Sequence, residues 1–327
     1  MEKKDLRIIF MGTPEFAVAT LRALVDGGYN VVAVVTQPDK PVGRHGSVLQ
    51  PSAVKQAALR YGIPVLQPEK MKDPEFLEQL RVFHADLQVV VAFRMLPEVV
   101  WAMPRFGTFN VHAALLPQYR GAAPINWAVI NGERETGVTT FFLDHDIDTG
   151  RIIDQRVFPI PDDADVEYVY DGLMELGATL ALDTVGKILQ GDGQVDSIAQ
   201  EQLPQYDAAA LRHAPKIFKE TCQINWQQTA KQVYDFVRGL SPYPGAWTTL
   251  MDADGSQPQV LKIFKSAKTG RPASGAVGTL VVERNRLFVN TLDELLELLD
   301  VQLAGKKRMD VRSFLNGFKQ IETRRIG

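Results

Sequence analysis

Three polar residues between positions 108 and 150 have types and spacing that suit acyl transfer. The run 108–112 (TFNVH) favours a β-strand, and a strand turns residues i and i+2 to one face, so Asn110 and His112 are expected side by side. An amide can donate a hydrogen bond to a developing oxyanion, and an imidazole can take or give a proton near neutral pH. Asp148 opens the turn 148–150 (DTG) and could reach back to orient His112. A capped strand with two ordinary turns is the alternative interpretation.

Strands that alternate with helices are expected to position this stretch. Apolar runs predict buried strands at residues 6–11, 31–35, 87–92 and 107–112. Helices are expected between the first and second of these strands and between the second and third. This alternation predicts a doubly wound α/β fold with a mostly parallel sheet, whose ligands bind at the carboxyl ends of the strands. Ala92 and His112 lie at such ends. Thr13 is expected to cap the first helix, which runs to about Gly27. The turn before that helix lacks the G-x-G-x-x-G fingerprint, so no dinucleotide site is expected.

The C-terminal part of the chain has a different pattern. Short β segments separated by turns are expected at residues 247–250, 260–266, 278–282, 286–290 and 295–301. They predict a smaller antiparallel β-barrel, OB-like in character, a shape often used to bind nucleic acid. The stretch 196–214 is rich in Gln, Ala and Pro and is interpreted as a linker. The predicted organisation is therefore a catalytic domain at 1–195, a linker at 196–214 and a barrel domain at 215–327.

Length and composition indicate a two-domain globular protein. The chain has 327 residues, of which 45% are hydrophobic and 23% are charged. Its one cysteine, Cys222, cannot form an intramolecular disulfide and is expected to be a small buried hydrophobe in a reducing cytoplasm. No apolar run approaches the roughly 20 residues of a membrane span, and the N-terminus does not resemble a signal peptide. The sequence has no P-loop and no metal-ligand spacing, so a cytoplasmic protein without membrane or metal is expected.

The net charge of −3 is unevenly distributed. Residues 1–206 carry 18 Lys and Arg against 27 Asp and Glu, whereas residues 207–327 carry 18 against 12. An acidic front part joined to a basic back part favours an anionic partner for the back part. An ordinary solvated surface explains the charge equally well.

Four short motifs resemble the signature of the folate-dependent formyltransferases. They are residues 110–112 (NVH), 115–117 (LLP), 120–125 (RGAAPI) and 148–150 (DTG). The family's Asn, His and Asp correspond to Asn110, His112 and Asp148, so the resemblance implies that these are the catalytic residues. The chain departs from the family at Ala113-Ala114, where relatives have Gly-Ser, and at Asp146, where relatives commonly have Gly.

The resemblance also implies a formyl donor and the pocket that holds it. The donor is 10-formyltetrahydrofolate, and the family's chemistry needs no metal. The segments that line the family's folate pocket correspond here to Phe93, Arg94, Met95, Leu96 and Pro97, and to Ala114, Leu115, Leu116 and Pro117. The first segment is one residue shorter than in relatives, and Arg94 replaces a small residue.

The resemblance covers nearly the whole chain and is greatest to the members that act on tRNA. The loop 37–44 (QPDKPVGR) is similar to a family loop near the acceptor end of tRNA, which implies tRNA contacts at Lys40 and Arg44. The run 304–309 (AGKKRM) is similar to part of the family's C-terminal domain. The implied tRNA contacts there are Lys306, Lys307 and Arg308. The function expected from the resemblance is formyl transfer to the methionine α-amine of initiator methionyl-tRNA, by a monomer, for translation initiation.

Three alternatives stay open at the level of the sequence. A 10-formyltetrahydrofolate hydrolase shares the Asn, His and Asp but uses water as the acceptor and needs no basic second domain. A formyltransferase acting on another amine, such as a sugar nucleotide, shares the same three residues. A non-catalytic RNA-binding protein on an enzyme scaffold is the third alternative, and the intact trio argues against it.

Overall fold

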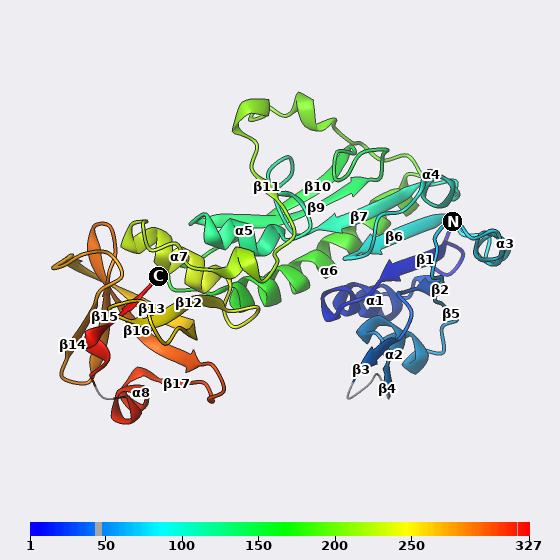
Figure 1. Ribbon diagram of the computed structural model, residues 1–327. Coiled ribbons are helices and arrows are strands. Elements are labelled where there is room, and N and C mark those ends of the chain that lie inside the picture. The colour runs from blue at the N-terminus through cyan, green and yellow to red at the C-terminus, as the bar shows by residue number, and fades with distance from the viewer. Residues whose placement is uncertain (43–47, 319) are drawn as a thin grey trace. The chain divides into compact units, whose positions relative to one another are not determined.

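The chain packs as two compact units in the computed structural model, which describes residues 1–42, 48–318 and 320–327 (Figure 1). The first unit comprises Met1–Gly121, Thr136–Pro159 and Tyr170–His213, and the second comprises Ala122–Glu135, Ile160–Val169 and Ala214–Gly327. Two stretches from the first 195 residues therefore pack with the C-terminal part of the chain. The domain boundaries expected from the sequence stay a prediction.

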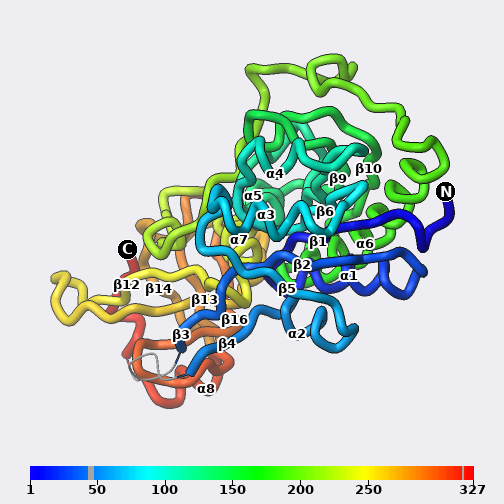
Figure 2. Tube along the Cα trace, turned by 90° about the vertical axis from the view of Figure 1, so that its right-hand side faces the viewer, coloured from blue at the N-terminus to red at the C-terminus, as the bar shows by residue number. Residues whose placement is uncertain are grey.

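The sheet of the first unit has the strand order β10-β9-β7-β6-β1-β2-β5. Its strands are β1 (Arg7–Gly12), β2 (Asn30–Val35), β5 (Val65–Leu66), β6 (Leu87–Val91), β7 (Thr108–His112), β9 (Glu135–Phe142) and β10 (Ile152–Pro159). All pairs from β5 through β2, β1 and β6 to β7 are parallel, whereas β9 is antiparallel to β7. Figure 2 shows β6, β1, β2 and β5 stacked side by side in that order. The predicted doubly wound, mostly parallel α/β sheet is confirmed.

Helices cover both faces of this sheet, which explains why its central strands are apolar on both sides. These helices are α1 (Glu15–Asp26), α2 (Ala53–Arg60), α3 (Pro74–Val82), α4 (Glu98–Trp101) and α6 (Val166–Gln190). α6 lies against one face, where a Cβ on Gly177 would be 3.3 Å from the Val111 side chain of β7. α3 and α4 pack on the other face with Ile9 and Met11 of β1, both fully buried. Full burial of one such side chain contributes about 1.5–3 kcal/mol.

The start of α1 differs from the expectation. Pro14, not Thr13, occupies the N-cap position, and it provides no side-chain cap. The Thr13 hydroxyl instead accepts a hydrogen bond from Thr36 Oγ1 at 3.5 Å, at the end of the neighbouring strand β2. A tertiary contact at the strand ends therefore replaces the local cap.

The second unit contains a nearly closed antiparallel barrel with the strand order β14-β15-β16-β13-β12-β18. Its strands are β12 (Ala246–Asp252), β13 (Gln259–Pro272), β14 (Leu280–Glu283), β15 (Arg286–Asn290), β16 (Glu294–Leu303), β17 (Met309–Asp310) and β18 (Arg324–Ile326), and helix α8 (Val311–Gly317) lies between β17 and β18 in the chain. Register shifts along β13 against β16 bend the sheet. Ile326 N–H donates to Gly278 O at 2.9 Å, which brings β18 back to the start of β14. The predicted smaller barrel is confirmed.

Helix α5 (Pro124–Ile130) packs against α7 (Ala230–Gly239) within the second unit. Asn126 Nδ2 donates to Gly239 O at 2.9 Å, and a Cβ on Gly239 would lie 2.8 Å from Ile130 N. Only glycine permits so close an approach at position 239. The remaining short strands are β3 (Lys40–Val42), β4 (Val48–Gln50), β8 (Arg120–Gly121) and β11 (His213–Ala214).

Candidate active site

Strand β7 presents Asn110 and His112 on the face opposite to α6. Val111 between them turns toward Gly177 of α6, as the two-residue period of a strand requires. His112 is 6% exposed, and Asn110 is partly exposed. The Asn110 Oδ1 atom is nevertheless buried and has no hydrogen-bond partner among the residues that the structure describes. Because a buried polar atom without a partner is costly, this amide is suited to bind a ligand atom.

The imidazole of His112 has polar partners on both of its nitrogens. Nε2 lies 2.9 Å from the carbonyl oxygen of Tyr119, and because a carbonyl can only accept, Nε2 is assigned the hydrogen. Nδ1 lies 3.8 Å from Asp148 Oδ2, an ion-pair distance rather than a hydrogen bond. Nδ1 is therefore the nitrogen that can take a proton, beside a carboxylate that would stabilise the resulting positive charge.

The turn that carries Asp148 has an uncommon backbone conformation. Asp148 has φ = +56°, in the left-handed region that Asp tolerates better than most residues. Its Oδ2 atom accepts the Gly121 N–H at 2.9 Å, and only 12% of the side chain is exposed. A Cβ on Gly150 would lie 1.7 Å from Phe142 O, so position 150 requires glycine. The Asp-Thr-Gly motif thus bends the chain sharply and aims the carboxylate inward.

Gln200 holds the same turn from the other side. Its side chain is fully buried, and Nε2 donates to the carbonyl oxygens of Asp148 and Gly150, both at 2.9 Å. Its Oε1 accepts from Arg120 Nε at 3.1 Å and Nη2 at 2.6 Å. Gln200 falls within the linker predicted from the sequence, where no role is expected for it. A single Gln within a Gln-rich stretch offers no local signal for such a position.

The stretch 196–214, interpreted from sequence as a linker, is anchored beside this turn. Ile198 exchanges two backbone hydrogen bonds with Ile152 of β10, at 2.8 and 2.9 Å. Ile198 and Leu203 also pack against a buried cluster that contains Leu116 and Phe141. These contacts fix the backbone on both sides of Gln200.

The segment Ala114–Pro117 is held by side chains from β9 and β10. Thr139 Oγ1 donates to Ala114 O at 2.6 Å and accepts from Leu116 N–H at 3.1 Å. Gln155 Nε2 donates to Leu116 O at 2.8 Å. Ala114 is fully buried, so a methyl group fills the position at which relatives carry Ser. The backbone path of this segment is therefore set without a Ser hydroxyl.

The segment Phe93–Pro97 follows β6 at the carboxyl edge of the sheet. The Arg94 guanidinium donates to Glu69 O at 2.8 Å and to Pro68 O, and burial lowers the pKa of Arg94. Met95 is 70% exposed, whereas Leu96 is buried. A cavity of about 780 Å³ is lined by Lys70, Met71, Lys72, Met95, Leu96, Pro97, Glu98 and Val99. Its volume falls within the range usual for small-molecule sites, about 300–1,000 Å³.

Of the two basic residues predicted on the loop 37–44, one is described. Lys40 is exposed and begins β3, and Arg44 lies outside the described residues. The approach to β3 is fixed by Asp39, whose carboxylate accepts from Lys55 Nζ at 2.7 Å and Gln67 Nε2 at 2.7 Å. These hydrogen bonds lower the pKa of Asp39.

The three basic residues predicted in the barrel differ in their surroundings. Lys306 and Lys307 are exposed in the turn between β16 and β17. Arg308 instead donates to Asp300 Oδ2 at 2.8 and 2.6 Å, and its guanidinium lies 4.4 Å from the centre of the Phe264 ring. The hydrogen bonds to Asp300 raise the pKa of Arg308. Arg308 is exposed as well, but its charge is already paired within the barrel.

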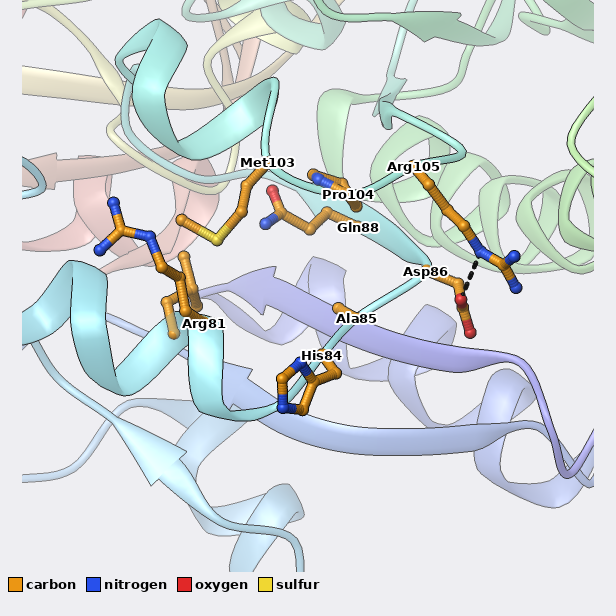
Figure 3. Close-up of a pocket in the computed structure, with 9 residues that line it drawn as sticks. Arg81, His84, Ala85, Asp86, Gln88, Met103, Pro104 and Arg105 are labelled. Carbon is orange, nitrogen blue, oxygen red and sulfur yellow. Dashed lines mark hydrogen bonds and ion pairs between the residues drawn. The ribbon is translucent and has the colours of Figure 1, made fainter.

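A second cavity lies near the opposite, amino end of β6 (Figure 3). Its volume is about 460 Å³, and Arg105 on its rim is paired with Asp86 at 2.7 Å. Gln88 lines it with a buried Nε2 that has no partner in the described part of the chain. Thr108 Oγ1 lies 3.0 Å from Gln88 Oε1, but its one hydrogen is donated to Trp101 O at 2.7 Å. Exchanging the oxygen and nitrogen of the Gln88 amide would let Nε2 donate to Thr108 Oγ1. The cavity contains none of the predicted site residues.

No helix in the described chain is both long enough and apolar enough to span a bilayer. The described residues also hold no cluster of three or more His, Cys, Asp or Glu side chains that could bind a metal ion. Cys222 is a buried free thiol whose pKa is raised by burial.

Comparison with known proteins assigns the family to which this two-unit fold belongs. The family model described as formyl transferase matches residues 6–185, and its C-terminal domain model matches residues 216–319. The chain belongs to the formyltransferase family. It is 62% identical over 328 residues to methionyl-tRNA formyltransferase of Parabacteroides distasonis, covering 100% of both chains. It is 48% identical over 320 residues to the protein of that name from Porphyromonas gingivalis, covering 97% of both.

Solved structures share the fold at lower sequence identity. WlaRD, a sugar 3N-formyl transferase crystallised in the presence of dTDP and 5-N-formyl-THF, superposes with a TM-score of 0.63 at 18% identity, covering 94% of this chain and all of that one. HypX from Aquifex aeolicus in complex with tetrahydrofolic acid gives a TM-score of 0.60 at 18% identity, covering 96% of this chain and 47% of that one.

Proposed function

We propose that this chain transfers the formyl group of 10-formyltetrahydrofolate to the α-amino group of methionine on initiator methionyl-tRNA. One observation carries the proposal: His112 follows Asn110 by two residues on β7 and has its Nδ1 3.8 Å from the Asp148 carboxylate, in a chain that matches methionyl-tRNA formyltransferases over its full length. The identity of 62% extends across both family regions, residues 6–185 and 216–319. This supports the same formyl acceptor for this chain as the name of that relative gives.

In the proposed mechanism, Asn110 and His112 stabilise the charge that develops during attack. The methionine amine forms a bond to the formyl carbon, and the formyl oxygen becomes an oxyanion. It accepts hydrogen bonds from the Asn110 amide and from Nδ1–H of protonated His112, whose Nε2–H is held by Tyr119 O. One well-placed donor contributes about 3 kcal/mol to such a transition state. Asp148 stabilises the imidazolium and helps to move the amine proton to the folate nitrogen as the bond between that nitrogen and the formyl carbon breaks.

The residues proposed to hold the folate are Phe93–Pro97 and Ala114–Pro117. Two features support this assignment: a cavity with a volume usual for small-molecule sites lies beside Met95–Pro97, and the second segment, which does not line that cavity, has its backbone fixed by Thr139 and Gln155. A rigid wall of backbone groups suits a heterocycle with several hydrogen-bonding atoms. When bound, the folate supplies an activated formyl group.

The residues proposed to contact tRNA are Lys40 and Arg44 near the acceptor end and Lys306 and Lys307 on the barrel. The excess of Lys and Arg after residue 206 supports this part of the proposal. Arg308 supports the barrel through Asp300, so its proposed contribution to tRNA binding is indirect. The enzyme is proposed to act as a monomer in the cytoplasm.

The test is transfer of labelled formyl from 10-formyltetrahydrofolate to charged initiator tRNA. Deacylated tRNA, which lacks the methionine amine, is the negative control. Free methionine and a sugar-nucleotide amine are tested as alternative acceptors, and release of formate measures hydrolysis. The proposal requires label in the methionyl ester of the tRNA at a rate far above formate release. Formate release that is equally fast without tRNA would instead identify a hydrolase.

A further inference from the structure

We infer that Gln200 is a positioning residue for this reaction: it sets the place of the Asp148 carboxylate relative to His112. The inference rests on the catalytic roles proposed for those two residues. The hydrogen bonds described for the Gln200 side chain go to Arg120 and to backbone carbonyls of the Asp148 turn, so its effect is transmitted through the backbone of that turn.

The hydrogen bonds around Asp148 form a closed circuit. Gly121 N–H donates to the Asp148 carboxylate, and Gln200 Nε2 donates to the Asp148 carbonyl, both at 2.9 Å. Arg120, the neighbour of Gly121, donates twice to Gln200 Oε1 and completes the circuit. The two ends of Asp148 are thus tied to adjacent residues of one loop.

Each hydrogen-bonding capacity of the Gln200 amide is used in this circuit. Both Nε2 hydrogens go to carbonyls of the turn, and Oε1 accepts both bonds from Arg120. The opposite amide orientation would place Nε2 against the Arg120 guanidinium, donor against donor, so the assignment is determined by its partners. A fully buried amide with four satisfied bonds rigidifies the groups that it joins.

The turn has a local hydrogen bond from Thr149 Oγ1 to Asp146 O at 3.1 Å, which leaves the carbonyls of Asp148 and Gly150 to Gln200. Asp148 lies in the left-handed region, and the residues before it, Asp146 and Ile147, are exposed. Loss of the Gln200 donors leaves the carbonyls of Asp148 and Gly150 free to rotate, and the carboxylate moves with them. A displacement of about 1 Å at a catalytic group can cost on the order of 100-fold in rate.

The test compares three variants by kcat and by KM for each substrate. Gln200→Met keeps the length of the side chain and removes all four bonds. Gln200→Glu keeps the acceptor for Arg120 and removes both donors to the turn. Gln202→Met, at a position two residues further along the same anchored stretch, is the matched control. Both Gln200 variants are expected to lower kcat by about 10- to 100-fold and to change either KM by less than threefold, while the control matches wild type.

A double-mutant cycle separates positioning from general structural support. If Gln200 acts through Asp148, adding Gln200→Met to Asp148→Ala lowers kcat by less than about threefold further. A full additional loss in that background overturns the inference. Wild-type kcat in Gln200→Glu also overturns it, because the bond to Arg120 would then be sufficient. If Gln200→Met does not fold, Gln200→Glu carries both measurements.

A structural readout keeps this inference distinct from the proposed function. The crystal structure of the Gln200→Glu variant is expected to show Asp148 Oδ2 displaced from its place 3.8 Å from His112 Nδ1. An unchanged distance overturns the inference whatever the acceptor is. Should wild type release formate and leave tRNA unmodified, the proposed function fails, and the same variants are then compared by formate release.

Discussion

The carboxylate of Asp148 lies 3.8 Å from His112 Nδ1 and at the same time accepts the Gly121 N–H at 2.9 Å. One oxygen therefore serves both a backbone donor and the imidazole. The Gly121 bond holds this oxygen, and the Gln200 bonds hold the backbone that carries it, so His112 meets a carboxylate in a set position. Because His112 depends on this carboxylate, we expect Asn110, His112 and Asp148 to act as one unit.

The first prediction concerns that cooperativity. Asn110→Ala, His112→Ala and Asp148→Ala are each expected to lower formyl transfer by at least about 100-fold, and the triple variant should be hardly worse than the worst single variant. Asp148→Asn can still accept from Gly121 but loses the charge, so it separates geometry from electrostatics. The measurement is single-turnover formylation with circular dichroism as the check on folding. Near-wild-type turnover by folded His112→Ala would remove the proposed mechanism.

The second prediction concerns the folate segment. Arg94 donates to the carbonyls of Pro68 and Glu69, so it is expected to shape the segment rather than to contact the pterin. Arg94→Met should raise KM for 10-formyltetrahydrofolate by about tenfold and leave KM for tRNA within about twofold, because a loss of uniform binding raises KM. Arg60→Met, at an exposed helix end, is the control. An equal rise in both KM values would contradict this role.

The third prediction separates the basic residues of the barrel by salt dependence. Lys306→Ala with Lys307→Ala should flatten the log–log salt dependence of tRNA binding by up to about 2, since each phosphate that is no longer neutralised changes the slope by about 0.9. Arg308→Ala should leave that slope almost unchanged and lower the melting temperature, since its charge is already paired with Asp300. The slope is measured from Kd at several salt concentrations, with Lys4→Ala as the control. A slope that responds to Arg308 alone would reverse this assignment.

The fourth prediction concerns acid stability through Asp154 of β10. Burial raises the pKa of this carboxyl, but hydrogen bonds from Lys187 of α6 and the Gln155 N–H, with the charges of Lys187 and Arg156, outweigh it and lower the pKa. A lowered folded-state pKa stabilises the protein above the unfolded value of about 3.9, and the stabilisation is lost as pH falls through the folded value. Asp154→Asn should therefore melt about 1–3 °C below wild type at pH 7, and the difference should shrink as pH falls below about 4 toward the folded-state pKa.

The pH prediction is checked by melting temperatures from neutral pH down to about pH 3, below the unfolded-state value. Asp163→Asn, at an exposed carboxylate, is the control and should follow wild type throughout. A difference between wild type and Asp154→Asn that grows as pH falls would show the opposite sign of linkage.

The sequence alone determined the features that depend on local period and on short motifs. The two-residue period of a strand placed Asn110 and His112 on one face, and the alternation of apolar strands with helices indicated the parallel sheet and its ligand edge. The motif of residues 148–150 identified Asp148, because Asp and Gly are residues that such a sharp turn accepts. Each of these features rests on forces between near neighbours, which a sequence shows directly.

Only the tertiary structure decided the contacts between residues far apart in the chain. Gln200 meets Arg120 across 80 positions and the Asp148 turn across 52, and no period or composition marks that meeting. The hydrogen bonds from Arg94 to Glu69 and Pro68, 25 and 26 positions away, likewise follow from which strand ends become neighbours. Such partners are selected by packing and by the need to satisfy buried polar groups once the chain has collapsed, and those forces leave no local trace in the sequence.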